Sequence, residues 1–83
     1  MNRSEFLSKL ADHKINAEGL VCFNDNFSDD IFVVNQNYYR WEVFYRERGE
    51  QFELKIFDSE SDALDYLFSH ILNIYPKDLL KNI

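Results

Sequence analysis

A chain of 83 residues can enclose one modest hydrophobic core, and its formal net charge of −6 opposes binding to the phosphates of a nucleic acid. One cysteine excludes an intrachain disulfide, and no apolar run approaches the roughly 20 residues that a membrane helix needs. With no secretory leader in the polar first residues, we expect a single soluble domain over residues 1–83 in the reducing cytoplasm.

The first predicted element is a helix that runs from Asn2 to about Lys14. Asn2 has the side chain of an N-cap, and Glu5 stands three residues later, which is the spacing of a capping box. Apolar residues then recur on one helical face, at Phe6, Leu7, Leu10 and Ala11. Asn16 and Gly19 fit the exit from this helix.

The next segment alternates between strand and loop composition. Residues 20–23 are predicted to form either a short strand or a buried connection. Residues 24–30 are rich in Asn, Asp and Ser, so we expect a surface loop. Residues 31–34 are β-branched or aromatic, which favours a strand, and residues 35–37 have the composition of a turn into a hairpin.

The hairpin has the clearest pattern, because apolar residues alternate on both of its strands. Pairing Arg46 with Gln51 brings both apolar sets onto one face of the sheet. This register sets Tyr45 opposite Phe52, Val43 opposite Leu54 and Trp41 opposite Ile56, with Tyr39 on the same face. The turn is 47–50, where Gly49 is the natural holder of a positive φ, and its residues do not fix the turn type.

A second helix is predicted to begin at Ser59, which is an N-cap with Asp62 at the third position. An apolar stripe on this helix faces the sheet and comprises Ala63, Leu64, Leu67, Phe68, Ile71, Leu72 and Tyr75. Pro76 is expected to end the helix, and residues 77–83 then tuck in or form one more turn. The predicted fold is α+β: an N-terminal helix, a three- to four-stranded antiparallel sheet with a C-terminal hairpin, and a C-terminal helix packed on one sheet face.

No group of residues indicates catalysis, a cofactor or a metal. His13 and His70 are far apart in the chain, and Cys22 lies in an apolar run typical of a buried residue. Residues 25–30 lack the spacing and the closing Glu of a calcium loop. Gly19 and Gly49 are the only glycines, which excludes a glycine-rich phosphate loop. We therefore predict that this protein is not an enzyme.

Two surfaces are candidates for binding a partner protein. The hairpin patch comprises Glu42, Phe44 and Arg46 on the second face of the hairpin, where Phe44 and Tyr38 are exposed among charges unless the N-terminal helix or the tail covers this face. The acidic edge comprises Asp58, Glu60, Asp62 and Asp65 at the start of the second helix, with Asp25, Asp29 and Asp30 as candidate extensions. The alternative for the acidic edge is helix capping and a solvated face.

Two segments of the hairpin and second helix resemble a known pattern. Residues 41–49, WEVFYRERG, and residues 57–63, FDSESDA, are similar to W-x-V-x-Y-x-E-R-G followed by F-x-S-E-x-x-A. This pattern resembles small immunity proteins of bacterial polymorphic-toxin and contact-dependent inhibition systems, in particular immunity protein family fifty-nine, over residues 39–72. The resemblance implies a cytoplasmic antidote that binds one cognate toxin domain, often a nuclease, and blocks its active site or substrate surface.

The acidic charge favours a basic partner, because opposite charge steers association. The main hypothesis is therefore an immunity protein that inhibits a basic toxin domain by contact. The alternative is an acidic regulatory or adaptor module, such as a nucleic-acid mimic, that binds another basic protein. The neighbouring gene discriminates between them, since a toxin gene supports the first hypothesis and a phage or housekeeping operon supports the second.

Overall fold

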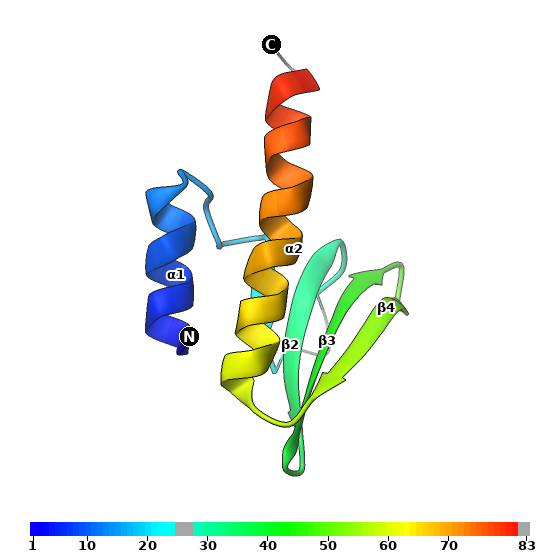
Figure 1. The fold of residues 1–83 in the computed structure, drawn as a ribbon. Helices are drawn as coiled ribbons and strands as arrows, with labels where there is room; N and C mark the ends of the chain where they lie inside the picture. The colour runs from blue at the N-terminus through cyan, green and yellow to red at the C-terminus, as the bar shows by residue number, and fades with distance from the viewer. Residues whose placement is uncertain (25–27, 82–83) are drawn as a thin grey trace.

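In a computed structural model, two helices and a four-stranded sheet follow one another in the order α1, β1, β2, β3, β4, α2 (Figure 1). The structure describes residues 1–24 and 28–81, and for residues 75–81 it describes the helical backbone alone. The predicted α+β class is confirmed, with the C-terminal helix on one face of the sheet. No helix in the described part of the chain is both long and apolar enough to span a membrane.

Helix α1 spans Arg3–Asp12 and begins with the predicted capping box. The backbone N–H of Glu5 donates to Asn2 Oδ1 at 2.8 Å, and the backbone N–H of Asn2 donates to Glu5 Oε1 at 3.3 Å. These two bonds satisfy donors that a helix start otherwise leaves unpaired. Phe6 and Leu10 are the buried residues of α1, whereas the other two members of the predicted face are exposed.

The sheet has the strand order β1-β2-β3-β4. Its strands are β1 (Val21–Phe23), β2 (Ile31–Asn37), β3 (Arg40–Glu47) and β4 (Glu50–Phe57). Strand β1 is the short strand predicted for residues 20–23, and it pairs with β2 in parallel. The sheet is therefore mixed, although the β2–β3 and β3–β4 pairs are antiparallel as predicted.

The turn between β2 and β3 lies at Tyr38 and Tyr39, later than the predicted 35–37. Residues 35–37 instead continue the ladder with β3, because cross-strand pairing outweighs their local turn preference. The turn between β3 and β4 is where it was predicted. Arg48 and Gly49 have φ values of 52° and 79°, and positive φ at both central residues is the signature of a type I′ turn.

The predicted register of β3 and β4 is correct only near their turn. Tyr45 pairs with Phe52, but Val43 pairs with Lys55, because a bulge places both Glu53 and Leu54 opposite Phe44. The predicted Val43–Leu54 and Trp41–Ile56 pairs are therefore wrong. One extra residue in β4 moves every later side chain to the opposite face.

The bulge changes which apolar residues enter the core. Leu54 and Ile56 are 43% and 53% exposed, whereas Phe57 lies opposite Trp41 and packs against the main core. Phe52 precedes the bulge, pairs as predicted and is still 43% exposed. Trp41 is partly buried against the same core. Tyr39, predicted on the core face, is exposed in the β2–β3 turn.

Helix α2 spans Glu60–Lys81 and begins as predicted, with the Asp62 N–H donating to Ser59 Oγ at 3.1 Å. Its fully buried residues are Ala63, Leu64, Leu67 and Ile71, which belong to the predicted stripe; the side chain of Tyr75 lies outside the described part. The predicted stop at Pro76 is wrong, because the helix continues to Lys81. A proline removes one backbone donor and kinks a helix without obliging it to end. Residues 82–83 lie outside the described residues.

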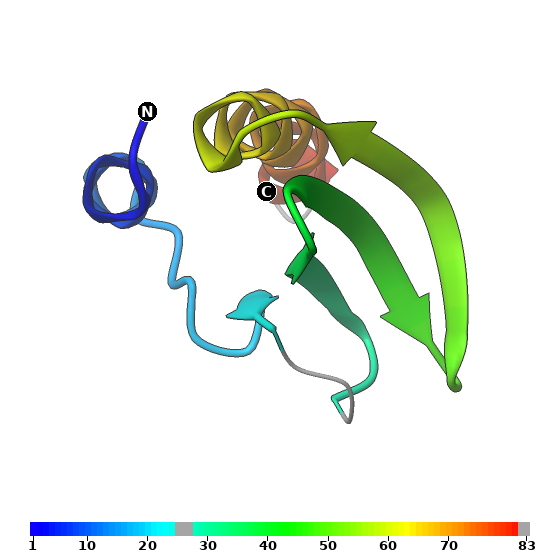
Figure 2. The same cartoon turned by 90° about the horizontal axis from the view of Figure 1, so that it is seen from below.

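The two helices lie on the same side of the molecule. The sheet curves beneath α2, and α1 lies beside α2 on the side away from β4 (Figure 2). The main core fills the space between α2, α1 and the inner face of the sheet, which is the face toward α2. A second, smaller cluster of Ile31, Val33 and Phe44 lies on the outer face.

Candidate protein-binding surfaces

The hairpin patch is not the exposed aromatic surface that was predicted. Phe44 is only 1% exposed, because Ile31 and Val33 cluster with it on the outer face. The guanidinium of Arg46 lies over the ring of Phe44 at 5.4 Å and donates from Nη1 to the carbonyl of Ser28 at 3.3 Å. Arg46 is itself buried. Neither side chain is presented to a partner in this structure.

The N-terminal helix and the tail were predicted as alternative covers of the outer face. Ser28 contacts this face instead. Because the Ser28 carbonyl accepts from Arg46 on the outer face, Ser28 lies over that face, opposite α2. Glu42, the third member of the patch, is half-buried and pairs with Ile56 rather than with the predicted Lys55.

An exposed apolar surface remains beside the hairpin patch, at the β2–β3 turn. Tyr38 and Tyr39 are 90% and 78% exposed, and Ile56 adjoins them. They line a shallow hollow of about 230 Å³ together with Arg40 and Glu42. We call these five residues the turn patch. It keeps the composition predicted for the hairpin patch and shares Glu42 with it; Tyr38 is exposed here as predicted, whereas Phe44 and Arg46 are not part of the turn patch.

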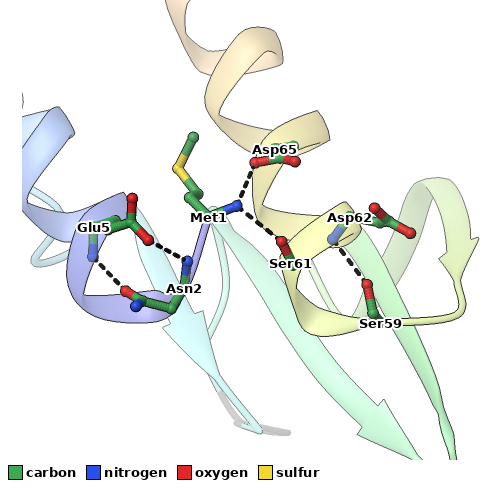
Figure 3. A network of polar contacts seen from close by, with 7 residues as sticks. All are labelled: Met1, Asn2, Glu5, Ser59, Ser61, Asp62 and Asp65. Atoms are coloured by element: carbon green, nitrogen blue, oxygen red, sulfur yellow. Dashed lines mark hydrogen bonds and ion pairs between the residues drawn. The ribbon is translucent and has the colours of Figure 1, made fainter.

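The acidic edge at the start of α2 is partly neutralised within the chain (Figure 3). The amino group of Met1 lies 2.7 Å from the Asp65 carboxylate and also donates to Ser61 Oγ at 2.9 Å. Arg3 Nη2 lies 2.7 Å from Glu60 Oε2. Among the described residues, Asp58 and Asp62 form no ion pair, so they carry the open charge of this edge.

The predicted extensions do not join the acidic edge. Asp29 Oδ1 accepts the Gly49 N–H at 3.0 Å, which places Asp29 beside the β3–β4 turn. The Asp30 N–H donates to the Arg46 carbonyl at 2.6 Å, at the same end of β3. Asp58 follows Phe57, which pairs with Trp41 near the start of β3. It therefore lies at the opposite end of β3 from Asp29 and Asp30. Asp25 lies outside the described residues.

A groove that the sequence did not predict lies between α2 and the turn end of the β3–β4 hairpin. Its volume is about 590 Å³. Its apolar lining is formed by Leu20, Phe32, Tyr45, Phe52 and Ile74, and its polar lining by Asp30, Glu47, Glu53 and His70. We call this feature the hairpin groove. Three carboxylates therefore surround an aromatic floor.

The bulge in β4 turns Glu53 into the hairpin groove. On a regular strand Glu53 would point away from Phe52, but both line the groove. Glu53 has a φ of 56°, in the left-handed region that costs a residue with a Cβ roughly 1–2 kcal/mol. Its carboxylate lies 3.7 Å from Nε2 of His70. A strained residue therefore supplies one of the three groove carboxylates.

His70 is held between aromatic rings. Its imidazole stacks on Tyr66 at 5.7 Å with an interplanar angle of 14°, and it meets the edge of Phe32 at 5.6 Å. Burial, and secondly the negative charge of Glu53, raise the pKa of the Tyr66 phenol above its ordinary value. The phenol therefore stays neutral at physiological pH, and the acidity of the groove comes from its carboxylates.

The groove residues carried a partial sequence signal. His70 and Ile74 stand four and eight residues after Tyr66, which places them on one helical face. Glu53 had no such signal, because its direction depends on the bulge. Among the side chains that the structure describes, those of residues 1–24 and 28–74, no cluster of His, Cys, Asp and Glu is suited to a metal ion. No protein-family model, curated protein or solved structure matches this chain.

Proposed function

We propose that this protein is a cytoplasmic immunity protein that binds a cognate bacterial toxin domain, favoured to be a basic nuclease, and occludes its active or substrate-binding surface. The observation that carries the proposal is the hairpin groove, where carboxylates of three separate segments lie around aromatic side chains, with Phe52 43% exposed. The resemblance over residues 39–72 directs the proposal toward toxins rather than toward other basic proteins.

The surface near β4 has the anatomy of a protein interface. Phe52 is exposed at the hairpin groove, Leu54 and Ile56 are exposed on the side away from α2, and the charged residues Glu53 and Lys55 alternate with them along β4. Interfaces generally have an apolar centre with aromatic residues and a polar rim. The net charge of −6 adds a long-range attraction to a basic partner, which raises the association rate.

The test is the product of the neighbouring gene. We expect its purified toxin domain to bind this protein with an association rate that falls as salt is added, and co-expression to protect cells from the toxin. Absence of both binding and protection would refute the proposal. Binding without protection would favour the adaptor alternative.

The acidic edge supplies a second test of charge steering. Reversing the two open charges, with Asp58→Lys and Asp62→Lys, should slow association with the toxin domain about tenfold and change dissociation little. Stopped-flow or surface-based kinetics at low salt measure both rates. An unchanged association rate would show that this edge does not face the partner.

A further inference from the structure

We propose that the hairpin groove receives an arginine side chain of the partner, so that its guanidinium lies among the groove carboxylates and against the aromatic floor. This inference rests on the proposed function, because it names the chemistry by which the toxin domain is recognised. It moves the centre of recognition from the acidic edge of α2 to the space between α2 and β4.

The first argument is unmatched charge. Asp30, Glu47 and Glu53 come from the entry to β2, the end of β3 and the bulge of β4, and they converge on one hollow. Among the described residues, none of the three forms an ion pair with a Lys or Arg side chain. Of the two arginines that flank Glu47 in the sequence, Arg46 is directed to the outer face by Ser28, and Arg48 forms no ion pair among the described residues. The three carboxylates are therefore available to a cation that a partner supplies.

The second argument is the aromatic floor. Phe32 and Tyr45 meet edge to face at 5.0 Å, and Phe52 beside them is 43% exposed. A guanidinium is planar and weakly hydrated, so it stacks on aromatic rings while its N–H groups bind carboxylates. An ammonium gains the charge but less of the stacking, which favours arginine over lysine.

The third argument concerns the size and the charge of a partner segment that the hairpin groove can hold. The groove volume of about 590 Å³ lies within the roughly 300–1,000 Å³ of ordinary ligand sites, so it holds a long side chain and part of its segment. A second copy of this chain brings its own net charge of −6 to an acidic groove, which disfavours self-association there. The groove therefore complements a basic partner.

An NMR titration tests the groove without the toxin. The probe is the blocked tripeptide glycyl-arginyl-glycine amide, and the matched probes carry lysine or neutral citrulline in place of arginine. We expect saturable amide shifts at Glu47, Glu53 and His70, with a dissociation constant on the order of 1 mM for arginine and weaker binding for lysine. Equal shifts with citrulline, no saturable shift, or shifts gathered at Asp58 and Asp62 would each overturn the inference.

Two variants separate the groove from the general acidity of the protein. Glu53→Gln removes one charge inside the groove, and Asp12→Asn removes one exposed charge on α1, away from it. We expect Glu53→Gln to weaken binding of the arginine tripeptide about fivefold and Asp12→Asn to leave it unchanged. Equal weakening by both variants would mean a nonspecific charge effect and would overturn the inference.

The toxin domain then separates the two proposals. If the domain binds the native protein and loses affinity for the Glu53→Gln variant, both hold. If it binds the Glu53→Gln and native proteins equally well, the partner's arginine does not enter the groove, and the proposed function still stands. If it does not bind the native protein, the proposed function fails, while the tripeptide titration still decides whether the groove selects arginine.

Discussion

Strands β2 and β4 are similar in length and apolar content, but their environments are opposite. The first four residues of β2 are buried, whereas β4 has no buried residue. Strand β2 has a strand on each side, α2 over its inner face and the Phe44 cluster on its outer face. Strand β4 is an edge strand, and its bulge turns two apolar residues away from α2. The position of a strand in the sheet therefore determines the burial of its residues more than its number of apolar residues does.

The largest expected effect contrasts the centre of the sheet with its edge. Phe44→Ala should lower the free energy of unfolding by about 3–5 kcal/mol, because it empties a buried site on β3. Ile56→Ala on β4 should lower it by less than about 1 kcal/mol, because that side chain is already half exposed. Chemical denaturation measures both values, and similar losses would contradict the contrast.

Trp41 should lie between these two cases. It packs against the main core while remaining partly exposed, so Trp41→Ala should cost about 2–3 kcal/mol, less than the truncation of a fully buried aromatic residue. The same denaturation experiment measures it. A loss as small as that of Ile56→Ala would place Trp41 outside the core and would overturn the packing described for β3.

A smaller effect of opposite sign is expected at the bulge. Glu53→Gly should raise the free energy of unfolding by up to about 1 kcal/mol, because glycine adopts a positive φ without strain. Leu54→Gly, one residue later, should lower it by about 1 kcal/mol, because its φ is not positive and glycine gains nothing there. If both variants are destabilised alike, Glu53 does not adopt the strained conformation.

The smallest effect is a pH dependence that links β4 to α2. The raised pKa of Tyr66 stabilises the fold fully below the unfolded-state pKa near 10, and this stabilisation is lost as pH rises through the folded-state pKa. Tyr66→Phe has no phenol to ionise, so the native protein should lose stability relative to this variant above about pH 10. If the free energies of unfolding of the native protein and of Tyr66→Phe change equally between pH values below and above about 10, the assignment is contradicted.

The sequence predicted well those features of the fold that depend on residues close together in the chain. Both helix caps, at Asn2 and Ser59, depend on residues three positions apart, and the β3–β4 turn depends on Gly49. The predicted extent of α2 was wrong, because a proline tolerates more than one backbone outcome.

Long-range features were not predictable from one sequence. An unbulged register satisfied the apolar alternation of β4, and the bulge residue is Glu53 rather than a glycine that would have marked it. The burial of Phe44 follows from its clustering with Ile31 and Val33 of β2 and from the position of Arg46 over its ring. Of the predicted site residues, the open charges of the acidic edge are exposed as expected, whereas the hairpin groove arises only when three strands and α2 meet.

The direction of Glu53 into the groove, and of Leu54 and Ile56 into solvent, depends on the register of β4. Cross-strand nuclear Overhauser effects between backbone protons of β3 and β4 measure this register directly. We predict contacts of Val43 with Lys55, together with contacts of Tyr45 with Phe52. Contacts of Val43 with Leu54 would indicate an unbulged strand, and they would contradict the groove and the proposals built on it.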